Sequence, residues 1–336
     1  MSVMLGLIEN ESLKILRRKR FRIVLIVLAA LLCLVVFAQN RQLQNQRKDH
    51  PERDWRAQTE KRAGDLERQI NQQRRGVPEQ WKRWMKYESG RLRYYLSKNL
   101  NPNELTGPVF TRAFAGVGSV LLIPLLIAVF GADLVSSEFA EGTITLLLTR
   151  PVARWKVLAS KVAAMVLFTT LTLLAAFFLA WGISGVAFGW SGWGAPILTG
   201  FRLGGASLSA GLDLSGVRSV PLWQDTFAAW GLAWFSAVAV GSITLLLSVV
   251  FRSAAAAMGT MMATLVGGTI LSRVASDWDG AKWFFVTNLP LPDFYAGLPT
   301  PFEGMTLAFS AWVNLAWALA ALATAFLLFT RRDVTA

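Results

Sequence analysis

The chain has 336 residues, of which 54% are hydrophobic and 16% charged, and its mean hydropathy is +0.42. A soluble domain carries roughly 25% charged residues, so this composition indicates a membrane protein. A single Cys (Cys33) excludes a disulfide framework, and a single His (His50) argues against a His metal site or a Ser-His-Asp triad. The net charge of +13 gathers in basic segments that flank apolar runs, which favours contact with anionic lipid over nucleic acid.

Residues 1–20 predict a short amphipathic helix at the membrane surface, with a disordered basic tail as the alternative. Its apolar face is expected to hold Met4, Leu5, Ile8, Ile15 and Leu16, with Glu9, Glu11, Lys14 and Arg17 elsewhere. The apolar run at 23–38 follows and predicts a first membrane span. A cleaved signal peptide is the competing interpretation, but the long leader and the later spans favour an uncleaved helix.

Residues 39–112 form the only large hydrophilic region of the sequence. A break at 76–78 separates two stretches that favour solvated helices. The region therefore predicts a helical hairpin that stands off the membrane. Its Trp and Tyr residues between 81 and 95 are expected to form the packing seam of this hairpin rather than grip a substrate.

The rest of the chain, 113–336, holds five further apolar runs that predict spans two to six, at 113–135, 157–188, 225–250, 254–271 and 307–329. The second is interrupted by Pro124, and a Gly-, Ser- and Trp-rich connection at 189–222 is expected partly at the membrane interface. The predicted fold is an all-α polytopic membrane protein with six transmembrane helices, an N-terminal interfacial helix and an extracytoplasmic helical hairpin between helices 1 and 2.

The basic residues of the short loops predict the orientation. If the chain has six spans, the following basic residues all lie on the same side of the membrane: Arg150, Arg154, Lys156, Arg252, Arg331 and Arg332. The opposite short loops are balanced or acidic. We therefore expect a multi-pass protein of the cytoplasmic membrane with both termini cytoplasmic and the 39–112 region outside.

A polar, charged segment at 133–161 lies between the second and third spans. It carries an acidic pair, Gly-Thr, a short Leu run, Pro-Val-x-Arg and a later Lys: Asp133, Ser137-Glu138, Glu141-Gly142-Thr143, Leu146-Leu147-Leu148-Thr149, Pro151-Val152, Arg154 and Lys161. This pattern resembles the signature of ABC-2 type transporter permeases, although Phe139 stands at a position that is often polar in that family. The six-span layout is similar over the full length.

The resemblance implies a permease subunit of an ATP-driven exporter, without catalytic or cofactor-binding residues of its own. The sequence has no G-x-x-x-x-G-K-[ST] loop, so ATP and Mg would bind to a separate cytoplasmic ATPase. A coupling helix at 136–150 would meet this ATPase, and a second permease copy or a related permease would complete the transporter. The implied coupling residues are Ser137, Glu138, Glu141, Gly142, Thr143, Pro151, Arg154 and Lys161.

Physical reasons accompany these roles. Glu138 and Glu141 favour the positive end of a helix and offer charge to basic groups of a partner. Gly142 permits a bend, and Pro151 ends the helix. Arg154 and Lys161 are expected to reach lipid headgroups. The alternatives are an ordinary interfacial loop or, for the whole chain, a membrane scaffold that docks partners through the 39–112 hairpin. The residues do not indicate the substrate.

Overall fold

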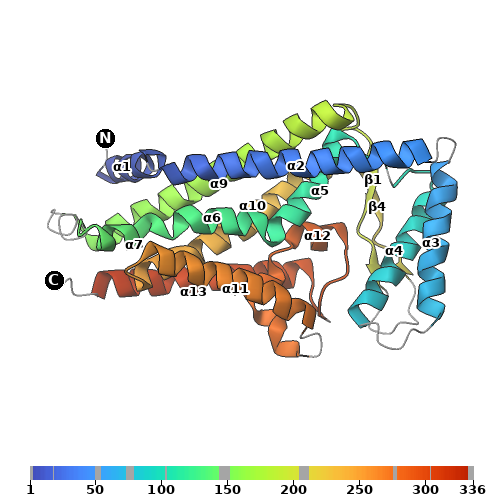
Figure 1. The fold of residues 1–336 in the computed structure, drawn as a ribbon. Coiled ribbons are helices and arrows are strands. Elements are labelled where there is room, and N and C mark those ends of the chain that lie inside the picture. Colours follow the sequence, from blue (N-terminus) through green and yellow to red (C-terminus); the bar gives the residue numbers. More distant parts are fainter. Residues whose placement is uncertain are drawn as a thin grey trace.

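The computed structural model describes residues 3–17, 19–49, 54–72, 79–102, 104–143, 152–203, 212–274, 278–302 and 304–331. Six described helices are long and apolar enough to cross a membrane: Lys19–Asn45, Leu122–Ala140, Arg154–Phe188, Leu222–Val250, Ala254–Ser272 and Leu307–Arg331. The prediction of an all-α polytopic membrane protein is therefore confirmed. Both described ends of the chain lie at one end of the bundle (Figure 1), which we call the terminal end.

In chain order, the helices of the bundle are α1 (Val3–Arg17), α2 (Lys19–Asp49), α5 (Gly107–Val120), α6 (Leu122–Gly131), α7 (Asp133–Ala140), α9 (Arg154–Phe188), α10 (Leu222–Val250), α11 (Ala254–Val274), α12 (Leu291–Ala296) and α13 (Leu307–Arg331). Two 3₁₀ helices, Asp279–Trp283 and Phe285–Asn288, precede α12. Helix α10 packs against α5, α6, α9 and α13. Its small buried residues allow this close approach.

The outer helices α2, α11 and α13 expose much of their apolar surface. Large side chains such as Ile26, Phe37, Ile270 and Leu319 are more than half exposed. A soluble monomer rarely leaves apolar patches of this extent in water. The distribution fits a bundle whose outer helices face lipid.

The second span is divided into three helices rather than one. The backbone breaks at Leu121, with φ −140° and ψ −47°, and the helix is interrupted more mildly at Ala132, which keeps helical dihedrals of φ −63° and ψ −23°. Pro124 lacks an N–H and its ring conflicts with the carbonyl four residues earlier, at Val120. The first break is therefore a consequence of this proline, and the second has a partner described below.

Helices α3 (Trp55–Asn71) and α4 (Glu79–Ser97) lie at the end of the bundle opposite to the terminal end, which we call the hairpin end (Figure 1). They pack against each other through Ala63, Leu66, Met85 and Leu92. The sequence analysis expected the tyrosines of α4 in this seam, but they lie outside it. Tyr87 and Tyr95 pack instead around Phe201, which is fully buried.

Four short strands connect α9 to α10 and were missed by the sequence analysis: β1 (Pro196–Thr199), β2 (Arg202–Leu203), β3 (Leu212–Asp213) and β4 (Arg218–Pro221). Strand β1 pairs antiparallel with β4, and β2 with β3. The strands lie between α4 and the bundle (Figure 1). At Gly200 the backbone has φ +88°, and a Cβ there would meet the Gly216 carbonyl oxygen at 2.4 Å. Glycine is therefore required where the strands meet.

Candidate functional site

The segment with the family-like pattern lies at the terminal end, where α7 ends the second span. Helix α7 stops at Ala140, and the turn 141–143 follows with Gly142 at φ +67°. This left-handed conformation favours glycine, so the expected bend at Gly142 is present. Residues 144–151 lie outside the described residues, and with them the Leu run, Pro151 and nearly half of the predicted coupling helix 136–150.

Four charged side chains from three helices form a largely buried cluster beside this turn, in which only Lys14 is partly exposed: Glu11 and Lys14 on α1, Glu138 on α7 and Lys161 on α9. The Lys161 ammonium donates to Glu11 Oε2 at 2.8 Å, to Glu138 Oε1 at 2.7 Å and to the Leu134 carbonyl at 2.7 Å. These three bonds use all three protons of the ammonium. Lys161 is fully buried, and both carboxylates are 4% exposed.

Lys14 completes the charge balance of the cluster. Its ammonium donates to Glu11 Oε1 at 2.8 Å and to Glu138 Oε1 at 2.7 Å. Burial alone would lower the pKa of Lys14, but the hydrogen bonds to the two carboxylates outweigh it and raise that pKa. Two positive and two negative charges therefore neutralise each other where α1, α7 and α9 meet.

A second ionic contact fixes the start of α2 to α7. The Arg20 guanidinium pairs with Asp133, which is 6% exposed. Next to it, the Phe21 ring packs edge-on against Phe168 of α9 at 4.9 Å between centroids. The N-terminal segment is thus held to α7 and α9 by charges and by aromatic packing together.

Ser248 of α10 closes the break between α6 and α7. Its hydroxyl accepts from the backbone N–H groups of Val135 and Ser136, at 2.9 and 3.0 Å, and donates to the Ala132 carbonyl at 2.7 Å. A helix break frees backbone groups that must be satisfied inside a membrane. This hydroxyl satisfies them and ties α7 to the central helix.

The structure corrects two expectations about the coupling residues. Lys161 does not reach lipid headgroups, because its ammonium is enclosed by two carboxylates. Glu138 does not present its charge at the surface, because it is buried among the same partners. Glu141 is exposed and remains the surface acid of this segment.

The remaining predicted residues lie around the turn. Ser137 is buried and its hydroxyl donates to the Asp133 carbonyl. Thr143 is exposed, and its hydroxyl donates to the Glu138 carbonyl at 3.5 Å. Arg154 begins α9 and donates to the Thr330 carbonyl of α13 at 3.3 Å. These residues are close to the cluster, but only Glu138 and Lys161 belong to it.

Glu11 and Lys14 were not recognised as site residues. The sequence analysis placed them away from the apolar face of an interfacial helix, whereas the structure buries Glu11 together with Ile15 and leaves Leu5 and Leu16 exposed. A signal was present. A lysine inside an apolar span needs a buried anion, and Glu11 and Lys14 share one helix face at the spacing i, i+3.

Comparisons with known proteins cover nearly the whole chain. Residues 5–334 match the family model described as "ABC-2 family transporter protein". The uncharacterized protein YhcI of Bacillus subtilis (strain 168) is 25% identical over 336 residues, which cover 98% of this chain and 99% of YhcI. The uncharacterized membrane protein YdbK of the same organism is 30% identical over 217 residues, covering 64% of this chain and 78% of YdbK.

Proposed function

Because the chain belongs to the ABC-2 family of transporter proteins, we propose that it is the permease subunit of an exporter whose ATP and Mg are bound by a separate ATPase. The ATPase would dock at the terminal end, which would then face the cytoplasm from within the cytoplasmic membrane. A second copy of the chain or a related permease would complete the transporter. The substrate is left open.

The buried cluster of Glu11, Lys14, Glu138 and Lys161 carries this proposal. Glu138 of this cluster lies three residues before the exposed turn 141–143. Ion pairs of the cluster join the three helices α1, α7 and α9. Breaking a buried pair costs about 3–5 kcal/mol, so a push on the turn would move α1, α7 and α9 together. Such a rigid connection is what a subunit needs to convert motion of an ATPase into motion of its spans.

The docking role is best tested at Glu141. Reversing Glu138 as well would disrupt the buried cluster, so its effect could not be assigned to a lost contact with the partner. We expect Glu141→Lys to insert into the membrane, while recovery of an ATP-binding protein with the tagged chain in mild detergent falls about tenfold, as like charges at an interface cost several kcal/mol. The unfolding midpoint of the variant is measured alongside, so that recovery is compared between folded proteins.

The matched control is Glu60→Lys, an exposed acid on α3 at the hairpin end. It should leave recovery of the ATP-binding protein unchanged. Equal recovery with the Glu141 and Glu60 variants would refute docking at the 141–143 turn. If no ATP-binding protein accompanies even the wild type, the transporter proposal fails, and the scaffold alternative would be supported by partners lost on deleting residues 42–100.

A further inference from the structure

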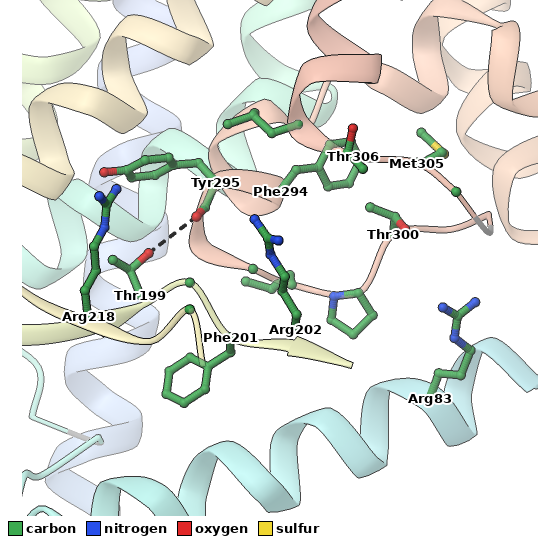
Figure 2. Close-up of a pocket in the computed structure, with 17 residues that line it drawn as sticks. Arg83, Thr199, Phe201, Arg202, Arg218, Phe294, Tyr295, Thr300, Met305 and Thr306 are labelled. Carbon is green, nitrogen blue, oxygen red and sulfur yellow. Dashed lines mark hydrogen bonds between the residues drawn. The ribbon is translucent and has the colours of Figure 1, made fainter. Parts of the chain in front are cut away.

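A cavity of about 710 Å³ lies at the hairpin end. Its walls come from α4, from the strands, from α12 and from the chain that leads into α13 (Figure 2). Glycine at 297 allows the chain around Phe201 to lie close to the end of α12. A Cβ there, where φ is +88°, would meet the Phe201 carbonyl oxygen at 2.1 Å. The Thr199 hydroxyl donates to the Tyr295 carbonyl across the same junction, at 3.4 Å.

Three arginines from three different elements line this cavity: Arg83 of α4, Arg202 of β2 and Arg218 of β4. Figure 2 shows that Arg202 and Arg218 extend from the strands toward α12. No described residue that lines the cavity is a carboxylate. Asp213 lies opposite Arg202 in the backbone register of β2 and β3, but it does not line the cavity. Its carboxylate accepts from the Ser215 backbone N–H at 2.9 Å.

Six other arginines of this end contrast with these three. Each forms an ion pair within the described chain: Arg56 with Asp54, Arg62 with Glu88, Arg68 with Asp65, Arg91 with Glu88, Arg93 with Glu67 and Arg112 with Asp225. None of the cavity arginines forms such a pair there, and the Nε of Arg83 is buried without a hydrogen-bond partner. Among the described residues, the cavity therefore holds guanidinium donors that form no ion pair, although the charge of Arg202 contributes to the lowered pKa of Asp213, mainly set by hydrogen bonds from Ser215.

The threonine hydroxyls of the cavity bond to the backbone and not to the arginines. Thr199 and Thr300 donate to backbone carbonyls, at 3.4 and 3.0 Å, and Thr306 accepts from the Phe309 N–H at 3.1 Å. Planar guanidinium groups bind phosphate and carboxylate in bidentate fashion. Figure 2 shows the three arginines spread along the cavity, with Arg202 between Arg218 and Arg83. A phosphate suits such a wall, because its oxygens accept from several directions.

The position of the cavity relative to the membrane spans indicates where that phosphate comes from. Residues 304–307 line it at the point where α13, a predicted span, begins. One turn further, Phe309 packs against Trp283, which is 59% exposed, at 4.9 Å between centroids. Exposed tryptophans at span ends are typical of the headgroup level of a bilayer. Apolar side chains, among them Phe294, Met305 and Leu307, form the wall nearest α13.

We propose that this cavity binds the phosphate group of an anionic amphiphile, with Arg202 and its neighbours along the cavity wall, Arg83 and Arg218, as donors to the headgroup and the apolar wall against its chain. The binding does not depend on ATP-driven transport, and it would stand if the chain moved no substrate. A soluble phosphate ester offers the same headgroup chemistry without the chain, so the test separates the two sources.

The test measures binding to the purified full chain in a neutral detergent. Three compounds are compared: dioctanoyl phosphatidate, dioctanoylglycerol, which lacks the phosphate, and inorganic phosphate. The cavity variant is R83Q/R202Q/R218Q. Its control, R62Q/R68Q/R93Q, removes the same charge from α3 and α4 outside the cavity. Thermal unfolding of both variants reports whether they are folded.

We expect phosphatidate to bind the wild type and the control within about twofold of each other, and the cavity variant at least tenfold more weakly, since hydrogen bonds to charged groups contribute about 1.5–3 kcal/mol each. Binding of dioctanoylglycerol to the wild type should not reach saturation. Inorganic phosphate binding as tightly as phosphatidate, and lost in the cavity variant, would support the phosphate site and assign a soluble ester. Equal binding of phosphatidate to the two variants, or of dioctanoylglycerol and phosphatidate to the wild type, would overturn the proposal.

Discussion

A charge cluster at the terminal end and the arginine cavity at the hairpin end differ in how their charges are balanced. At the terminal end, two carboxylates and two ammonium groups neutralise each other with distances of 2.7–2.8 Å. At the hairpin end, three arginines surround a cavity with no acidic lining residue among those described. The first arrangement is complete without a ligand, and the second is not.

This difference separates charges that belong to the fold from charges that are available for binding. A buried ion pair that is complete contributes little net stability over an apolar pair, but removing one partner leaves an uncompensated charge. The terminal end should therefore be sensitive to single substitutions of its charges. The three cavity arginines should tolerate such substitutions, and binding in the cavity should change instead.

The largest expected effect comes from Lys161→Met. The substitution leaves Glu11 and Glu138 buried with only Lys14 between them, and we expect a loss of about 3–5 kcal/mol in the free energy of unfolding. The unfolding midpoint in detergent measures it. Lys156→Met, on the same helix but outside the cluster, is the control and should cost much less.

A double variant, Glu138→Gln with Lys161→Met, makes the same comparison sharper. It removes one charge of each sign and leaves the Glu11–Lys14 pair at 2.8 Å. If charge balance decides stability at this end, the double variant should be more stable than Lys161→Met alone by more than about 1 kcal/mol. A double variant as unstable as the sum of its two single changes would contradict the account.

At the hairpin end, the corresponding test is steric rather than electrostatic. Gly297→Ala places a Cβ 2.1 Å from the Phe201 carbonyl oxygen at a φ of +88°. The left-handed conformation alone costs about 1–2 kcal/mol for alanine, and the clash adds to it. Gly304→Ala has a similar φ of +75° but open space around its Cβ, so it isolates the backbone cost.

We expect the unfolding midpoint to fall further for Gly297→Ala than for Gly304→Ala, because only the former pushes the strands and α12 apart. Equal midpoints for the two variants would mean that the wall of the cavity yields easily and is not held by this contact.

A smaller effect is expected at Ser248→Ala, which removes the acceptor of the Val135 and Ser136 N–H groups. Buried donors left without partners cost about 1–3 kcal/mol. The control is Ser242→Ala on the same helix, whose hydroxyl donates only to the Val238 carbonyl one turn back, at 2.9 Å. Hydrogen exchange of the α7 amides should increase in the Ser248 variant and not in the control.

The sequence predicted the spans well because each is a long apolar run, and hydropathy responds directly to that property. It predicted the place of the candidate site from the polar segment at 133–161. The partners of that segment could not be predicted, because the contacts of Lys161 with Glu11 and of Ser248 with Val135 join residues more than 100 positions apart. Local periodicity carries no information about such contacts.

The short strands and the arginine cavity were missed for a related reason. Strands of two to four residues offer too few positions for an alternating pattern. Arg83 and Arg218 are 135 positions apart, and each looks like an ordinary surface arginine in the sequence. Only the packing of α4, the strands and α12 brings them to one volume.

The smallest expected effect concerns Asp293 of α12, a carboxylate at the hairpin end that forms no ion pair among the described residues. Burial raises the pKa of Asp293 above 3.8, and Arg112 opposes this shift only in part. Between 3.8 and the raised value the native state binds more protons than the unfolded state, so Asp293 makes stability fall as the pH rises.

Asparagine does not ionise, so Asp293→Asn should raise the unfolding midpoint at about pH 7, and the gain should shrink at about pH 4, close to the unfolded-state value of 3.8. Asp279→Asn, at an exposed position, should change the midpoint little at either pH. A gain at Asp293 of equal size at both pH values would show that its charge is compensated in the folded protein. The hairpin end would then resemble the terminal end, and the contrast between them would rest on the three arginines alone.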